Sequence, residues 1–383
     1  MKQILRTLCA VGALIYAGDV SAMDIVGESS TTRGKDFRNI QEFNSFSQVP
    51  EIFDKRFIQE FRVNDGADIV NGVPIIVNGV PVIVDYIDKE AAPGKGVTHK
   101  PREEEWYGIS YHYSAGGRYS GLRDGCYMRG MGWHFNILQD GTITQFVPLG
   151  DVTFSAGVHS ENRASLWNGY TNLNNHHIFI MMFNDGWSKT DDGRIVWPEY
   201  TKEQVDAAKK LVNVLVEEYE ISPFNVIASS DGSMGRYPGP GPMFPFYLTQ
   251  KKFDISKFSK FDEEDHIALL KIIGYNNNGG NGKEFKCSYG TYVETFCMHY
   301  ISSKAKKNYS EHEGFTEADL KEMKSDFPRM LFSLIASRYN YMDSKGWYDK
   351  KFREDVNSFI EKREYAKPLA DLIQDWNELE SVK

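Results

Sequence analysis

The sequence IFIMMF at residues 178–183 is an unbroken apolar run, and it decides the fold class. A strand that is buried on both faces of a sheet has this composition, whereas a strand with one wet face alternates apolar and polar residues. The run therefore predicts a central strand, in a sheet that is covered by helices on both sides.

The residues that follow this run predict a helix and then a short strand. Thr201 and Gln204 have the spacing of a capping box, and apolar residues then recur at helical spacing up to Tyr219. Ser222 and Pro223 end this helix. Residues 226–228 predict another strand, and a loop rich in Gly and Pro occupies residues 229–246.

The residues before the central run predict more of the same sheet. Residues 107–113 are typical of a strand, and residues 133–138 and 142–147 predict a hairpin around the Asp140-Gly141 turn. We therefore expect residues 104–250 to form an α/β domain, with a central mixed sheet flanked by helices.

The flanking regions have different patterns. Residues 23–103 are predicted to be an N-terminal extension, and its tandem copies NGVPIIV (71–77) and NGVPVIV (78–84) favour a hairpin or a sheet edge. Residues 262–340 predict a small all-α module, interrupted by a loop at residues 276–282. Residues 341–383 predict a charged helical tail, and residues 251–260 a linker.

The first 22 residues have the pattern of a signal peptide. Lys2 and Arg6 give a positive start, residues 8–17 are apolar, and small residues precede a cleavage site expected after Ala22. The run is too short to span a bilayer, and no later stretch is apolar enough for a transmembrane segment. The sequence predicts an exported protein, periplasmic or secreted.

Charge and cysteine content exclude other classes. The formal net charge is -9, and no long Lys/Arg block appears, so a general nucleic-acid binder is excluded. Export permits disulfides. Cys287 and Cys297 are close enough in sequence to pair, which would leave Cys126 free, but three unpaired cysteines are an equal alternative. No Cys/His zinc spacing is present.

Four segments resemble one enzyme family in the right order. They are ISYHYSA (109–115), GWHFNI (132–137) followed by Asp140-Gly141, WNGYTNLN (167–174), and ASSD (228–231) with GRYPGPGPMFPF (235–246). They resemble zinc-dependent N-acetylmuramoyl-L-alanine amidases of the AmpD/AmiD type, which share a fold with peptidoglycan recognition proteins. Residues 268–275, 296–300 and 331–339 resemble a helical peptidoglycan-binding module.

The resemblance implies a zinc hydrolase, but the family's chemical groups are mostly replaced. In the family, zinc activates a water to cleave the amide between muramic acid and L-alanine, and a catalytic zinc ion usually has three protein ligands. His112 occupies the first ligand position. Ser229 and Gly239 occupy the other two. Met181 and Tyr237 stand where the family has a carboxylate and a Lys, and Ser155 replaces a further His.

We therefore expect the family zinc site to be absent, and no cofactor to be needed. A rebuilt zinc site remains an alternative, with His159, His134 or His177 as a relocated ligand. The competing expectations are a buried, hydrogen-bonded strand histidine at His134, a strand entry at residues 176–177, and a hydrogen-bonded groove histidine at His112. Ser303 and Lys306 have a Ser-Lys spacing, which arises by chance in Lys-rich helices.

The remaining groove-side groups predict a binding surface for peptidoglycan or muropeptides. Aromatic rings suit sugars, and an arginine can meet a peptide carboxylate bidentately, although Arg236 could instead pair with Asp231. The leading hypothesis is a non-hydrolytic peptidoglycan binder. The alternatives are an active zinc amidase with relocated ligands and a protein-interaction scaffold. The candidate binding residues are Tyr111, Tyr113, Asn184, Asp231 and Arg236.

Overall fold

The structure is a computed structural model. It describes residues 40–42, 73–77, 80–116, 119–156, 166–191, 195–235, 237, 239–244, 246, 250–275, 287–300, 317–343 and 346–380. Several expectations lie outside these residues, and they concern the signal peptide, His159, Arg236, and the pair Ser303 and Lys306.

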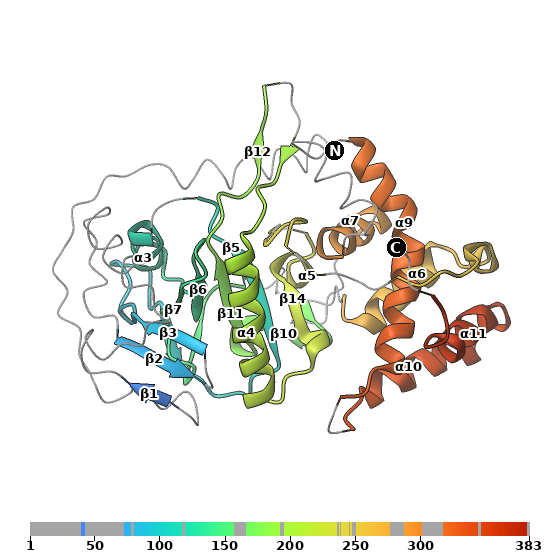
Figure 1. Ribbon diagram of the computed structural model, residues 1–383, viewed down its shortest axis with the longest axis horizontal. Helices are drawn as coiled ribbons and strands as arrows, with labels where there is room; N and C mark the ends of the chain where they lie inside the picture. The colour runs from blue at the N-terminus through green and yellow to red at the C-terminus, as the bar shows by residue number, and fades with distance from the viewer. Residues whose placement is uncertain are drawn as a thin grey trace.

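The described residues contain one eight-stranded mixed sheet with the order β1-β2-β3-β7-β6-β11-β5-β14 (Figure 1). Strand β11 pairs in parallel with both β5 and β6, and β14 pairs in parallel with β5. The other end is antiparallel, apart from the parallel pair β3–β7. The strands are β1 (Ile40–Glu42), β2 (Val73–Val77), β3 (Val80–Val84), β5 (Gly108–Tyr113), β6 (Phe135–Ile137), β7 (Ile143–Gln145), β11 (His177–Met182) and β14 (Val226–Ala228).

The sheet separates two apolar clusters, because successive side chains of a strand point to opposite faces. All six residues of β11 are buried, which confirms the predicted central strand. Ile178 and Ile180 pack on one side with helix α4 (Lys202–Glu218). Phe179 and Met181 pack on the other side, with α3 (Tyr119–Arg129) and the C-terminal helices. The predicted α/β fold class, with helices on both faces, is confirmed.

The local signals in the sequence correspond to the observed elements. The side chain of Thr201 accepts a hydrogen bond from the Gln204 backbone, as a capping box requires. Strands β6 and β7 form the predicted hairpin. The tandem repeat forms the antiparallel hairpin β2–β3, and β3 joins the main sheet through β7. Helix α3 was not predicted.

The short elements complete the α/β part of the molecule. Three two-stranded sheets join β4 (His99–Pro101) to β8 (Asp151–Thr153), β9 (Leu166–Trp167) to β10 (Tyr170–Thr171), and β12 (Ser188–Lys189) to β13 (Ile195–Val196). Two 3₁₀ helices, η2 (Leu173–Asn175) and η3 (Pro223–Asn225), precede β11 and β14. Helix α5 (Ser229–Gly232) follows β14 directly.

The C-terminal helices pack around one shared apolar core. They are α6 (Glu263–Ile273), α7 (Tyr289–His299), α9 (Glu317–Asn340), α10 (Lys350–Glu361) and α11 (Lys367–Asp375), with the 3₁₀ helices η4 (Ile255–Phe258) and η5 (Glu364–Ala366). The stretch expected as a linker also contributes to this core, since the Phe258 and Phe332 rings lie 4.2 Å apart. The expected tail contributes Phe359 and Leu372.

Neither a disulfide nor a membrane-spanning helix occurs in the described residues. Cys126, Cys287 and Cys297 are all free, so the suggested pair of Cys287 and Cys297 is not formed. Cys297 is buried, and its sulfur lies 3.8 Å from the Met323 carbonyl oxygen. In the same ranges, every helix is too short or too polar to cross a bilayer.

Candidate functional site

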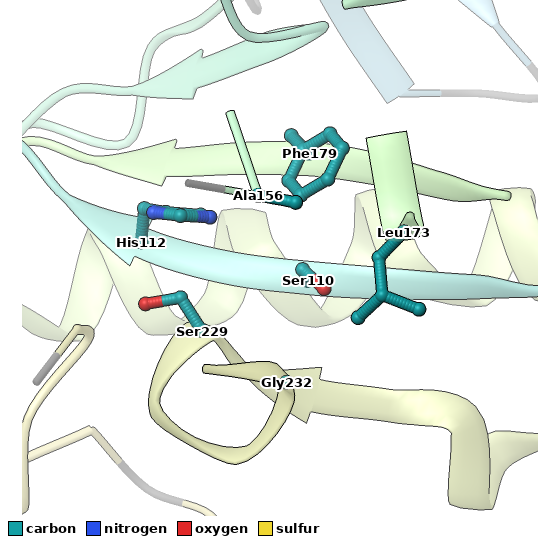
Figure 2. Close-up of a pocket in the computed structure, with 7 residues that line it drawn as sticks. All are labelled: Ser110, His112, Ala156, Leu173, Phe179, Ser229 and Gly232. Atoms are coloured by element: carbon teal, nitrogen blue, oxygen red, sulfur yellow. The ribbon is translucent and has the colours of Figure 1, made fainter. Parts of the chain in front are cut away.

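A small cavity lies beside β5, between β11 and helix α5 (Figure 2). Ser110 and His112 enter it from the same face of β5, and the register places Met181 opposite His112. Its volume is about 10 Å³, room for about one water molecule. The lining residues are Ser110, His112, Ala156, Leu173, Phe179, Ser229 and Gly232.

His112 contributes a neutral imidazole to this cavity. Its ring meets Phe179 edge to face, at 5.6 Å between centroids. Burial lowers the pKa of His112 to about 3, since a charged ring loses its hydration there. The buried Nε2 has no hydrogen-bond partner in the part of the chain that the structure describes. The hydrogen bond expected for His112 is therefore not formed at Nε2 by any of the described residues.

Ser229 and Gly239 contact each other on the far side of the cavity. The Ser229 hydroxyl donates to the Gly239 carbonyl oxygen at 2.9 Å, and the Ser230 amide donates to the same oxygen at 3.2 Å. A Cβ added at Gly239 would lie 3.0 Å from Ser229 Oγ and 3.1 Å from the Tyr113 backbone nitrogen. The loop therefore passes too close to β5 for position 239 to hold a side chain without a shift.

Two predicted binding residues point away from a surface. Tyr111 is 3% exposed and lies on the opposite face of β5 from His112, with its ring 4.5 Å from that of Phe244. Asp231 is fully buried and accepts a hydrogen bond from the Tyr275 hydroxyl at 2.7 Å. The expectation that these side chains line an open groove is wrong, because strand alternation turns Tyr111 toward α4 and the helices cover Asp231.

The other described candidates do not line the cavity. Of these, Tyr113 lies at its margin, next to His112 on β5 and against Gly239. Asn184 is buried, and its side-chain oxygen accepts from the Gly186 amide at 2.8 Å, so it shapes a turn. Tyr113 is half-buried and meets Trp197 edge to face at 5.8 Å. Burial raises the pKa of Tyr113. Tyr237 is half-buried, and its backbone amide donates to Ser233 Oγ at 3.0 Å.

His134 and His177 each have a hydrogen-bond partner within the described residues, although His177 Nε2, like His112 Nε2, has none there. His134 Nε2 lies 3.1 Å from the Asp151 carbonyl oxygen, while its Nδ1 accepts from the Phe179 amide at 3.0 Å. The expectation of a buried, hydrogen-bonded His134 is confirmed. His177 begins β11 as expected, and its Nδ1 lies 2.8 Å from Ser110 Oγ. Burial lowers the pKa of both rings to about 3.

Ser155 supports the cavity wall without entering it. Its hydroxyl donates to the Gly132 carbonyl oxygen. The side-chain oxygen of Asn174 accepts from the amides of Ser155 and Ala156 at 2.9 and 2.7 Å. These bonds hold Ala156 at the cavity. Sequence reasoning missed Ser110, which its alternation with His112 on one strand could have revealed. No sequence signal pointed to Ala156 or Leu173.

Residues 90–242 match the family model described as N-acetylmuramoyl-L-alanine amidase. This segment belongs to that family. AmiD from Escherichia coli (strain K12), itself named an N-acetylmuramoyl-L-alanine amidase, is 34% identical over 104 residues, which is 27% of this chain. The match spans only 35% of the length of AmiD.

Two solved structures resemble the chain more distantly. AmiD in complex with anhydro-N-acetylmuramic acid-L-Ala-D-γ-Glu-L-Lys is 21% identical, with a TM-score of 0.44, covering 59% of this chain and 88% of AmiD. AmpDh3 from Pseudomonas aeruginosa is 18% identical, with a TM-score of 0.45, covering 63% of this chain and 96% of AmpDh3.

The described residues of the amidase-family domain do not fit a catalytic zinc ion, which usually takes three protein ligands. Ser229 has a neutral hydroxyl that donates to a carbonyl, and Gly239 has no side chain. Within the described ranges, no three His, Cys, Asp or Glu side chains come together as a metal site would require.

Proposed function

We propose that this protein is an exported, peptidoglycan-directed member of the amidase family that binds peptidoglycan or muropeptides without hydrolysing them. The observation that carries the proposal is the hydrogen bond between Ser229 and the Gly239 carbonyl oxygen. These residues stand at two of the three positions where the family's ligands are expected, and the bond closes the loop between them.

The groups left in the cavity are poorly suited to hydrolysis. A general base works best when its pKa lies near the working pH, whereas burial lowers the pKa of His112 to about 3. An imidazole with so low a pKa takes up a proton weakly at neutral pH. The Ser229 hydroxyl donates its hydrogen to a carbonyl oxygen and not to His112.

The margin of the site has the groups that a binder needs. Tyr113 and Trp197 are half-buried aromatic residues in contact with each other, and each offers a large apolar face with a polar edge. Such rings suit the sugars of a glycan strand. Tyr237 lies in the loop after α5. Its sequence neighbour Arg236, whose placement the structure does not describe, has a guanidinium that suits the carboxylates of a stem peptide.

One observation favours a second candidate, an active zinc amidase with a relocated ligand. The Nε2 atom of His112 is buried and has no partner among the described residues. A buried polar atom without a partner is costly, and a metal ion would satisfy it. Further ligands would have to come from residues that the structure does not describe, such as His159.

Co-sedimentation with purified sacculi tests the proposal. We expect the full-length mature protein to sediment with sacculi, and no stem peptide to be released, with or without a chelator. Tyr113→Ala should weaken sedimentation. Tyr348→Ala serves as the control, because Tyr348 is a tyrosine of the helical part with 39% of its surface exposed.

Three results would argue against the proposal in different ways. A wild-type protein that stays in the supernatant would refute binding. Release of stem peptide that a chelator abolishes would establish the second candidate. Equal loss of sedimentation in both tyrosine variants would show that the cavity margin is not the binding surface.

A further inference from the structure

The helical part of the protein contacts helix α5 directly, and α5 is the element that carries Ser229 into the cavity. Figure 1 shows α7 beside α5. Between the two lies Asp231, a residue of α5 with no exposed surface. Its two oxygens meet a backbone amide of its own turn and two side chains that are distant in sequence.

Asp231 joins the α5 turn to the helices. Its Oδ2 accepts from the Ala228 backbone amide at 2.9 Å, which fixes the start of α5. The same oxygen lies within ion-pair distance of His299 Nδ1, at the end of α7, without the geometry of a hydrogen bond. Its Oδ1 accepts from the Tyr275 hydroxyl at 2.7 Å. One carboxylate is therefore shared between the site and the helical part.

The helical groups are themselves fixed in place. His299 is 1% exposed. The centroid of its ring lies 4.2 Å from that of Phe246 and 3.9 Å from that of Tyr300. Tyr275 is fully buried, and its ring meets Trp167 at 5.1 Å. Nearby, the backbone amide of Asn168 donates a hydrogen bond to the Gly274 carbonyl oxygen at 2.9 Å. The two partners of Asp231 thus have little freedom to move.

Burial makes these partners necessary. A carboxylate taken out of water is costly unless charged or polar groups replace its hydration. Without Tyr275 and His299, Asp231 would keep only the Ala228 amide among its described contacts. It would then turn toward water and release the first amide of the α5 turn, and Ser229 directly follows Ala228.

We propose that Tyr275 and His299 are positioning residues of the binding site: through Asp231 they hold α5, and thereby Ser229 and its bond to Gly239, in the geometry that ligand meets. The helices then act as a fixed part of the site and not as a separate module on a tether. The part of this proposal that concerns ligand rests on the proposed function.

The chain offers a matched pair of substitutions to test this. Tyr275→Phe removes a hydroxyl that donates to Asp231 at 2.7 Å. Tyr365→Phe removes a hydroxyl that donates to the buried Asp265 at 2.8 Å, inside the helical part. Both delete one hydrogen bond to a carboxylate, but only the first contacts α5. His299→Gln is a second variant that removes the other helical partner of Asp231.

Hydrogen exchange read by mass spectrometry, on peptides covering residues 226–235 of the full chain, is the first measurement. A hydrogen bond to a charged group is worth enough to change an opening equilibrium by about tenfold or more. We expect Tyr275→Phe to speed exchange in these peptides about tenfold. His299→Gln, which removes the ion-pair contact, should also speed exchange, and Tyr365→Phe should leave it unchanged. Unchanged exchange in the first two, or equal acceleration in all three, would overturn the proposal.

Binding of muramyl dipeptide, followed by calorimetry, is the second measurement. Tyr275→Phe should weaken binding about tenfold, while Tyr365→Phe keeps the wild-type affinity. Failure of the wild-type protein to bind this probe would count against the proposed function, and the exchange data would still decide the positioning role. Faster exchange with unchanged affinity would refute the positioning of ligand by these residues.

Discussion

Substitution of Gly239 by Ala tests how tightly the loop closes on β5. The new Cβ would lie 3.0 Å from Ser229 Oγ and 3.1 Å from both Cδ1 and the backbone nitrogen of Tyr113. The serine hydroxyl can rotate, but a backbone atom in the sheet cannot yield without moving β5. Overpacking of this kind typically costs about 1–3 kcal/mol. We expect Gly239→Ala to lower the stability of the protein by this amount.

Thermal unfolding measures the effect, because each kcal/mol shifts the Tm of a domain of this size class by about 2–4 °C. Gly121→Ala is the control. Gly121 lies inside α3 with nothing within 4 Å of an added Cβ, so alanine should stabilise by about 0.5–1 kcal/mol. The two variants should move Tm in opposite directions. An unchanged or raised Tm for Gly239→Ala would refute the reasoning, since position 239 would then have room for a side chain.

Two further predictions concern buried charge. Burial lowers the pKa of His112 from 6.5 to about 3. Between these pH values the histidine is protonated in the unfolded chain but neutral in the native state. The stability of the protein therefore falls as the pH falls from 6.5 toward 3. His112→Leu should make the fall of Tm between pH 6.5 and 4 shallower. The fall should not vanish, because His134 and His177 also have a lowered pKa. Parallel curves of Tm against pH for the wild-type protein and the variant would contradict this prediction. Arg338 is 2% exposed, pairs with Asp349, and donates to the Ile273 carbonyl oxygen at 2.6 Å. Arg338→Met should lower the free energy of unfolding, measured by urea denaturation, by about 3–5 kcal/mol. Lys351→Ala, which breaks an exposed ion pair, should lower it by less than about 1 kcal/mol. Similar urea midpoints for the two variants would contradict this prediction.

The sequence predicts the sheet well because its signals are local. An unbroken apolar run gave β11, a capping box gave α4, and an Asp-Gly turn gave the β6–β7 hairpin. Helix α3 escaped because it contains Gly121 and Gly125, and glycine disfavours helices. Its buried residues Tyr119, Leu122 and Cys126 are visible only once the structure is known.

The candidate site was harder to predict, for two physical reasons. Tyr111 was placed on the groove although strand alternation puts it opposite His112, so the signal existed and was not applied. Asp231 could not be placed at all. Its partners Tyr275 and His299 lie 44 and 68 residues further along the chain, and no local pattern relates residues so far apart.

The zinc content of the purified full-length protein after mild dialysis tests directly whether the zinc site of the amidase family is lost. We expect close to zero zinc per chain, because Ser229 and Gly239 offer a metal ion no charged or imidazole ligand beside His112. About one zinc ion per chain would contradict it, and hydrolysis would then become the leading function.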